Sequence, residues 1–378
     1  MNTKDMEEEK VYLNALNVAT DNDYPLIVAC KEFAGTYRRA WEFFVGLKCN
    51  IRNVRAALRL SKERSTDDRV VELQTFALKV DPYVEYNRLE QFGVVLFLPE
   101  DEGYPLSLAD LPQPPLGLYV RGDIHSVITQ DKVLAVVGTR MCTPYGKVVC
   151  ERIIPDVVCN GVTIISGLAL GIDALAHSLT VHDHGITVAV LGSGLGRLYP
   201  SQNKRLSEEI LDFGGALISE YHLLTEPFKF NFPRRNRIVA ALSRATLVVE
   251  APEKSGSLIT ATHALEIGRD VFAVPGAINS ENSFGTNKLI KDGALIATSS
   301  LDVLQYFGLN TQLDKSGVEL DDQEMEVIKI LDRNGGSMHT DALCVEFSNK
   351  GITYIISLLT QLELKDVVKV EGTRIIKL

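Results

Sequence analysis

The sequence lacks the patterns that mark several protein classes. Its 6 cysteines are scattered and no two form a C-x-x-C pair, which argues against a zinc ribbon and against a disulfide scaffold. The longest apolar runs, such as "GITVAVLGSG", are far shorter than the ~20 residues of a membrane-spanning helix. The start "MNTKDMEEEK" is acidic, whereas a secretory signal begins basic and continues apolar. These features predict a cytoplasmic protein with reduced thiols and no membrane partner.

Motifs of cofactor sites and catalytic sites are also scarce. No G-x-G-x-x-G fingerprint follows the first predicted strand, no P-loop is present, and "GSGLG" after the third strand has the wrong spacing for a dinucleotide. The sequence contains no G-x-S-x-G elbow and no cysteine with an obvious base partner. We therefore expect no cofactor and no enzymatic activity.

The segment "GIDALAH" places Asp173 and His177 four residues apart, on one face of a predicted helix. This spacing favours a hydrogen-bonded pair that fixes the helix end over an acid–base dyad. His182 and His184 lie two residues apart and do not converge on a helix, so they do not by themselves predict a metal site.

The composition is that of a globular protein with an acidic balance. With 378 residues, 46% hydrophobic and 23% charged, the chain can form a core and two or three domains. A net charge of -10 argues against nucleic-acid binding over the whole surface but leaves a local basic patch possible. One segment is basic: residues 230–249, "FNFPRRNRIVAALSRATLVV", contain four arginines and no acidic residue.

Three regions differ in pattern. Residues 1–90 have the apolar spacing of helices, for example in "VYLNALNV" and "NVRAALRLSKER", and predict a helical domain. Residues 91–310 contain seven short apolar runs, from "KVLAVVG" to "GALIAT", with stretches long enough for crossover helices between the first five. They predict a Rossmann-like, doubly wound α/β fold with a mostly parallel sheet buried on both faces. Residues 317–378 predict three helices and a hairpin that turns at Glu371 and Gly372, the order of a winged helix.

Small residues follow nearly every predicted strand. Ligands of parallel sheets bind outside the carboxyl ends of the strands, and small residues let backbone N–H groups approach a phosphate there. The candidates are Gly138 and Thr139 with Arg140, Ser166 and Gly167, Gly194, and Ser255, Gly256 and Ser257. Several such loops along one edge, together with arginine, predict an extended anionic ligand. For any single glycine the alternative is a tight turn.

Basic and aromatic residues add to this prediction. Arg140 follows the first strand's turn, where its guanidinium can grip a phosphate, and the alternative is a pair with a local carboxylate. Lys204 begins the helix after the third strand. Its ammonium group either contacts the ligand or is solvated, and the sequence favours neither. In "FNFPRRNR" aromatic residues precede cationic ones, a pattern typical of single-strand binding sites. The alternative is that Phe230 or Phe232 is a core residue. Some of the arginines can instead pair with Glu220 or Glu250.

The middle region resembles the DprA/Smf family of DNA-processing proteins. The similar stretches occur in family order over about residues 95–305 and include "VVGTRMCTPYG", "GVTIISGLALGIDALAH", "FPRRNRIVAALS" and "SGSLITATHALEIGRDVFAVPGAI". The resemblance implies an extended Rossmann fold that binds single-stranded DNA without sequence preference and dimerises through that domain. It also implies loading of the RecA recombinase during natural transformation.

The resemblance also implies a set of DNA-binding residues. The family's Gly-Ser/Thr-Arg motif falls on Gly138, Thr139 and Arg140, with the arginine as a phosphate ligand. Lys204 and the "FPRRNR" block, with Phe232, Arg234, Arg235, Asn236 and Arg237, would complete the basic pocket.

The outer regions depart from the family pattern. "NVATDNDYPLIVACKEFAG" lacks the Gly-x-Gly turns that many members carry in a DNA-binding helical domain. Residues 311–378 hold twelve acidic and eight basic residues, a net of -4, and the third helix offers Lys350 and few other cations. For the C-terminal module we expect a protein contact rather than insertion into a DNA groove.

Two other functions compete with single-strand binding. A nucleotide phosphoribohydrolase on a related Rossmann fold would carry a P-G-G-x-G-T-x-x-E pattern, and "EKSGSLITATHALE" has serine and threonine where its second glycine and its catalytic glutamate are expected. A transcription factor acting through the winged helix is disfavoured by the acidity of that module.

Overall fold

The computed structural model describes residues 3–46, 67–124, 131–309, 322–334, 336–347, 351–365 and 367–377. The chain divides into two compact units, Met1–Leu309 and Asn310–Leu378. The predicted helix "NVRAALRLSKER" and Lys350 lie outside the described residues.

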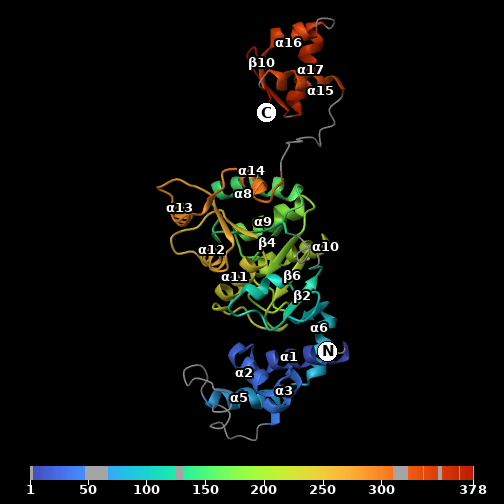
Figure 1. The fold of residues 1–378 in the computed structure, drawn as a ribbon, viewed down its shortest axis with the longest axis vertical. Coiled ribbons are helices and arrows are strands. Elements are labelled where there is room, and N and C mark those ends of the chain that lie inside the picture. The colour runs from blue at the N-terminus through green and yellow to red at the C-terminus, as the bar shows by residue number, and fades with distance from the viewer. Residues whose placement is uncertain are drawn as a thin grey trace. The chain divides into compact units, whose positions relative to one another are not determined.

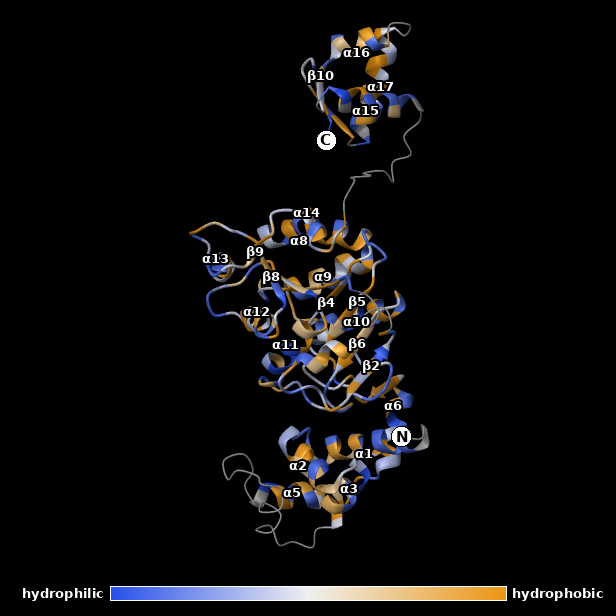
Figure 2. Ribbon diagram, in the orientation of Figure 1, coloured by the Kyte–Doolittle hydropathy of each residue, from blue (hydrophilic) through white to orange (hydrophobic). Residues whose placement is uncertain are grey.

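The N-terminal region is helical, as predicted. Its helices are α1 (Thr3–Thr20), α2 (Tyr24–Ala34), α3 (Tyr37–Gly46), α5 (Asp67–Ala77) and α6 (Pro82–Gln91). Asp23 and Asp81 cap α2 and α6, each followed by a proline in the first turn, where its missing N–H costs nothing. Hydrophobic and hydrophilic residues are interleaved along these helices (Figure 2), as expected where one side of each packs into a core.

These helices pack against the sheet within the same compact unit. The hydroxyl of Tyr119, which is fully buried, accepts a hydrogen bond from Asn17 Nδ2 at 2.9 Å and donates one to Asn14 Oδ1 at 3.0 Å. Because a buried phenol needs a partner, this contact fixes α1 against the strand that carries Tyr119.

The seven predicted apolar runs form parallel strands: β3 (Val133–Val137), β4 (Thr163–Ser166), β5 (Thr187–Val190), β6 (Ala216–Ser219), β7 (Ala245–Val248), β8 (Asp270–Ala273) and β9 (Leu295–Ile296). Two antiparallel strands, β1 (Val94–Phe97) and β2 (Leu118–Gly122), extend the sheet beside β6. The order is β1-β2-β6-β5-β4-β3-β7-β8-β9. The strand order therefore reverses between β3 and β7.

Helices cover both faces of this sheet (Figure 1). On one face α8 (Pro144–Cys159), α9 (Ile172–His182) and α14 (Ser300–Tyr306) pack on Leu134 and Val136. On the other, α11 (Asn231–Ala241) and α12 (Gly256–Glu266) pack in the cluster that holds Val133, Ala135 and Val137. Side chains of β3 thus alternate between two cores, as the period of a strand requires.

Short elements complete the unit: α10 (Lys204–Asp212), α13 (Phe284–Lys291), and the 3₁₀ turns η1 (Leu106–Asp110), η2 (Ser201–Asn203) and η3 (Glu281–Ser283). Together, the elements of residues 94–306 confirm the α/β class and the mostly parallel sheet.

In the C-terminal unit, the described residues form three helices and a small sheet. These are α15 (Asp322–Arg333), β10 (Ser337–His339), α16 (Thr340–Glu346), α17 (Ile352–Leu364), β11 (Val368–Glu371) and β12 (Arg374–Lys377), with strand order β10-β12-β11. The predicted helices and hairpin are present, and Gly372 at the turn has a φ of 63°, which glycine adopts without steric cost. The strand β10 was not predicted. That the unit belongs to the winged-helix class stays a prediction.

Candidate nucleic-acid interface

A groove of about 590 Å³ lies at the carboxyl ends of the parallel strands. Its walls come from the loops after β3, β4 and β7 and from the first turns of α11 and α12. The groove lies where the adjacent strands β3 and β7 end. From β3 the chain continues to β4 on one side, and from β7 it continues to β8 on the other side. Such a switch point is where α/β sheets bind ligands.

The groove brings together most of the predicted site. Its lining includes the predicted residues Gly138, Thr139, Arg140, Gly167, Phe232, Arg235, Asn236, Ser255, Gly256 and Ser257. Ser255 caps α12 by accepting a hydrogen bond from Ser257 N, so the first turn of that helix opens into the groove. Helix N-termini favour anions, in agreement with the predicted phosphate site.

Arg140 is exposed at the groove wall. Its guanidinium carbon lies 5.6 Å from the ring centre of Phe232. Among the described residues Arg140 forms no ion pair with a carboxylate, in contrast to Arg121, Arg234 and Arg237. Its charge therefore remains available to a phosphate.

The loop that carries Arg140 is fixed by Glu250. The backbone carbonyl of Glu250 accepts a hydrogen bond from Thr139 N at 2.8 Å, and its buried carboxylate accepts one from Thr143 N at 3.0 Å. Thr143 in turn caps α8 by accepting from Gly146 N. Glu250 thus holds the loop after β3 and does not pair with the arginines of α11.

Arg235 lines the groove but is only 3% exposed. Its Nη1 donates to the carbonyl oxygens of Gly167, at 2.7 Å, and of Val190. Burial lowers the pKa of Arg235 to about 10, which leaves it charged at neutral pH. Arg235 Nε also donates to Asn236 Oδ1 at 3.2 Å. Arg235 therefore links the ends of β4 and β5, which gives it a structural role, and its predicted contact with DNA stays a prediction.

Asp173 lies beside this arginine, and its Oδ2 accepts a hydrogen bond from Gly167 N at 3.1 Å. Burial raises the pKa of Asp173, and the positive charge of Arg235 opposes that shift. The predicted hydrogen bond between Asp173 and His177 is absent: His177 Nδ1 instead lies 2.6 Å from Thr187 Oγ1. Burial lowers the pKa of His177 to about 3, so this ring is a neutral core residue.

Arg234 and Arg237 lie outside the set of groove-lining residues. Arg237 pairs with the buried carboxylate of Glu220, and Arg234 Nε lies 3.7 Å from the same carboxylate. The alternative that arginines of this cluster pair with Glu220 is confirmed. The cluster lies in the first turns of α11 rather than in an extended chain, so successive arginines point to different sides.

Three further predicted residues also lie elsewhere. Ser166 is fully buried and donates to the carbonyl oxygen of Val136 at 2.6 Å. Gly194 faces the loop after β6, where an added Cβ would lie 2.2 Å from the carbonyl oxygen of His222. Lys204 is exposed at the start of α10, outside the groove lining.

The sequence reasoning missed Tyr199, Lys229 and Lys254, which all line the groove. Tyr199 and Phe232 have ring centres 5.6 Å apart, and neither Phe232 nor Phe230, which is 71% exposed, is a core residue. Lys254 directly precedes Ser255 of a predicted loop, and Lys229 alternates with Phe228 and Phe230. Both lysines could have been predicted from the sequence, because each lies next to residues that were already candidates.

No group of His, Cys, Asp or Glu suited to hold a metal ion occurs in the part of the chain that the structure describes. Within the same residues, none of the helices combines the length and the apolar character needed to cross a membrane.

The fold and groove define a Rossmann-like protein with a basic and aromatic site at the switch point of its sheet. Residues 95–308 match the family model of DNA recombination-mediator protein A, so the chain belongs to the DprA/Smf family. Protein Smf of Escherichia coli strain K12 is 43% identical over 228 residues, which span 59% of this chain and 59% of that protein. DNA processing protein DprA of Streptococcus pneumoniae is 41% identical over 223 residues, spanning 59% and 76% of the two chains.

Solved structures show the same fold. The X-ray structure of DprA from Streptococcus pneumoniae superimposes with a TM-score of 0.61 at 32% identity and covers 78% of this chain and 97% of its own. DprA from Helicobacter pylori, whose structure describes a single-stranded DNA binding mode, has a TM-score of 0.52 at 30% identity and covers 57% and 95%. The family resemblance seen in the sequence is confirmed.

Proposed function

We propose that this protein binds single-stranded DNA without sequence preference in its switch-point groove, as a DNA-processing protein of transformation. The observation that carries the proposal is the combination of Arg140, Lys229 and Lys254 with the rings of Tyr199 and Phe232 in one groove. Cations follow a phosphate backbone and aromatic faces accept any base. The single-strand binding described for the Helicobacter pylori relative supports the same assignment.

The charges of the groove also favour a nucleic acid. Among the residues that the structure describes, four cations, Arg140, Lys229, Arg235 and Lys254, line it with one carboxylate, Asp173. That carboxylate accepts a backbone N–H and lies beside Arg235, so it neither repels a phosphate strongly nor is placed as a free base. We accordingly propose a non-enzymatic role.

Family membership extends the proposal to partners. It supports dimerisation through the Rossmann domain and loading of the RecA recombinase onto the bound strand. For the acidic C-terminal unit we propose a winged-helix fold that contacts a protein.

The test is electrophoretic mobility of a single-stranded and a duplex oligonucleotide over a salt series. We expect the single strand to be shifted at lower protein concentration, with affinity that falls steeply with salt, because each phosphate contact releases counterions. Equal or tighter binding of the duplex, or no shift of either, would contradict the proposal. Release of free base from nucleoside monophosphates would favour the phosphoribohydrolase instead.

A further inference from the structure

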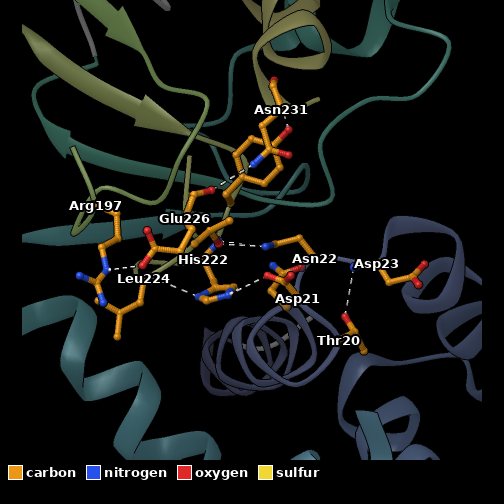
Figure 3. A network of polar contacts seen from close by, with 12 residues as sticks. Thr20, Asp21, Asn22, Asp23, Arg197, His222, Leu224, Glu226 and Asn231 are labelled. Atoms are coloured by element: carbon orange, nitrogen blue, oxygen red, sulfur yellow. Dashed lines mark hydrogen bonds and ion pairs between the residues drawn. The ribbon is translucent and has the colours of Figure 1, made fainter. Parts of the chain in front are cut away.

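The turn between α1 and α2 is hydrogen-bonded to the loop after β6, residues 220–230, by the side chain of Asn22 (Figure 3). Asn22 Nδ2 donates to Thr225 Oγ1 at 2.9 Å, and Asn22 Oδ1 accepts from His222 N at 2.9 Å. Asp21 and Asn22 have φ values of 52° and 59°, a region that Asn and Asp enter more readily than other non-glycine residues. An asparagine at position 22 therefore fits the positive φ of the turn and also forms both hydrogen bonds to the loop.

Neighbouring residues of the same turn reach the same part of the protein. Asp21 Oδ1 lies 3.8 Å from His222 Nε2, and the proximity of His222 lowers the pKa of Asp21. The ring of Tyr24 lies 5.5 Å from the guanidinium carbon of Arg234, in the first turn of α11. The α1–α2 turn thus contacts the beginning of loop 220–230, and the first residue of α2 contacts the helix that follows this loop.

The far end of loop 220–230 lies in the groove, since Pro227 and Lys229 are part of its lining. Thr225 is held from two sides, by Asn22 and by Gly194 N, which donates to the Thr225 carbonyl oxygen at 3.0 Å. Beyond Thr225 the backbone bonds are local: Phe228 N donates to the Glu226 carbonyl oxygen and Asn231 N to that of Phe228. The exposed pair of Arg197 and Glu226 adds little, as surface ion pairs do.

We propose that Asn22 is a positioning residue, through which the N-terminal helices hold Lys229 in the DNA groove. The proposal rests on the proposed function, and it gives these helices a part in DNA binding without contact to DNA. Asn22 is not among the groove-lining residues, so its removal acts through the loop. Lys254, which lines the groove from the loop after β7, is independent of this contact.

The test measures the affinity of the full chain for a fluorescein-labelled oligodeoxythymidine. Asn22→Gly keeps the positive φ and removes both hydrogen bonds. We expect its binding to weaken about fivefold, a typical coupling between neighbouring groups. The slope of log affinity against log salt should fall by about 0.7, because one phosphate contact is lost. Asn22→Asp should bind as wild type, since it keeps the acceptor for His222 N and can accept from the Thr225 hydroxyl.

A double-mutant cycle separates positioning from general damage. In a Lys229→Ala background Asn22→Gly should cause no further loss, whereas in a Lys254→Ala background it should cause its full loss. Thr225→Val, which removes only the contact to Asn22 Nδ2, provides the same cycle if Asn22→Gly does not fold. Equal losses in both backgrounds, or wild-type binding by Asn22→Gly beside weakened binding by Lys229→Ala, would overturn the proposal and leave the function standing. If Lys229→Ala, Lys254→Ala and Arg140→Ala all bind as wild type, the proposed function itself is wrong.

Discussion

Arg140 and Arg235 line the same groove but differ in what their guanidinium groups contact. Arg140 is exposed and faces the ring of Phe232, whereas Arg235 is buried and donates to the carbonyl oxygens of Gly167 and Val190. Because Arg235 is buried and its Nε and Nη1 already donate inside the protein, it is less available than Arg140 for a phosphate contact. Of the predicted arginines, Arg140 is therefore the one we propose as a phosphate ligand.

Arg235→Met should destabilise the protein strongly. The substitution leaves Asp173 buried without a counter-charge and leaves two carbonyl oxygens without a donor, so we expect a loss of about 3–5 kcal/mol in the free energy of unfolding. Urea unfolding measures this loss. Adding Asp173→Asn should recover part of it, because no charge is then left unpaired.

Arg234→Met is the matched control for that substitution. Its side chain is 33% exposed and its ion pair with Glu220 is 3.7 Å long, so we expect a loss below about 1 kcal/mol. Losses of similar size for Arg234→Met and Arg235→Met would contradict the structural role of Arg235.

At the scale of elements, the loop after β6 is held by a close backbone approach at Gly194. An added Cβ there would lie 2.2 Å from the carbonyl oxygen of His222 and 2.3 Å from that of Leu223, and neither backbone atom can move alone. We expect Gly194→Ala to lower the free energy of unfolding by about 1–3 kcal/mol, as overpacking does, and to weaken DNA binding by displacing loop 220–230. Urea unfolding and mobility shift measure the two effects.

Gly256→Ala is the control, since an added Cβ at that position meets no atom within 4 Å. It lies at the start of α12, where alanine favours the helix, so its stability should be unchanged or slightly higher. If Gly256→Ala lowered stability as much as Gly194→Ala, the close approach at Gly194 would not be the cause.

The elements differ in how well the sequence predicts them. The parallel strands were predicted because runs such as "KVLAVVG" are apolar on both faces and are followed by small residues. Strands β1 and β2 were not predicted, because "VVLF" is followed by leucine and proline rather than small residues and "LYVRG" contains an arginine. The helix α11 begins at Asn231, before Pro233, and the sequence showed its arginines as a cluster without showing which of them point inward.

The residues of the candidate site also differ in how well the sequence predicts their positions. Gly138, Thr139 and Arg140 follow a strand directly, so topology alone places them at the sheet edge. Ser166 ends β4 and Gly194 follows β5, but Ser166 turns into the core and Gly194 meets a neighbouring loop. Tyr199, Lys229 and Lys254 enter the groove through tertiary packing of loops, which residue spacing does not encode.

At the scale of the whole molecule, an acidic chain carries a basic groove. The net charge is -10, whereas four cations and one carboxylate of the described residues line the groove. A net negative surface disfavours nucleic acid, so the binding that we propose would be concentrated where Arg140, Lys229 and Lys254 gather. The arginines of residues 230–249 contribute mainly to the structure around the groove. Arg235 donates to the carbonyl oxygens of Gly167 and Val190, and Arg237 pairs with Glu220.

The most direct test of this account is the affinity of Arg140→Ala for a single-stranded oligonucleotide over a salt series. We predict binding that is weaker by roughly tenfold for all sequences, as for loss of a charge-assisted contact, with a salt slope lower by about 0.7. The control Arg205→Ala removes an arginine that is 92% exposed on α10 and pairs with Glu209, and it should bind as wild type. Wild-type affinity and slope for Arg140→Ala would contradict the assignment of the groove to DNA.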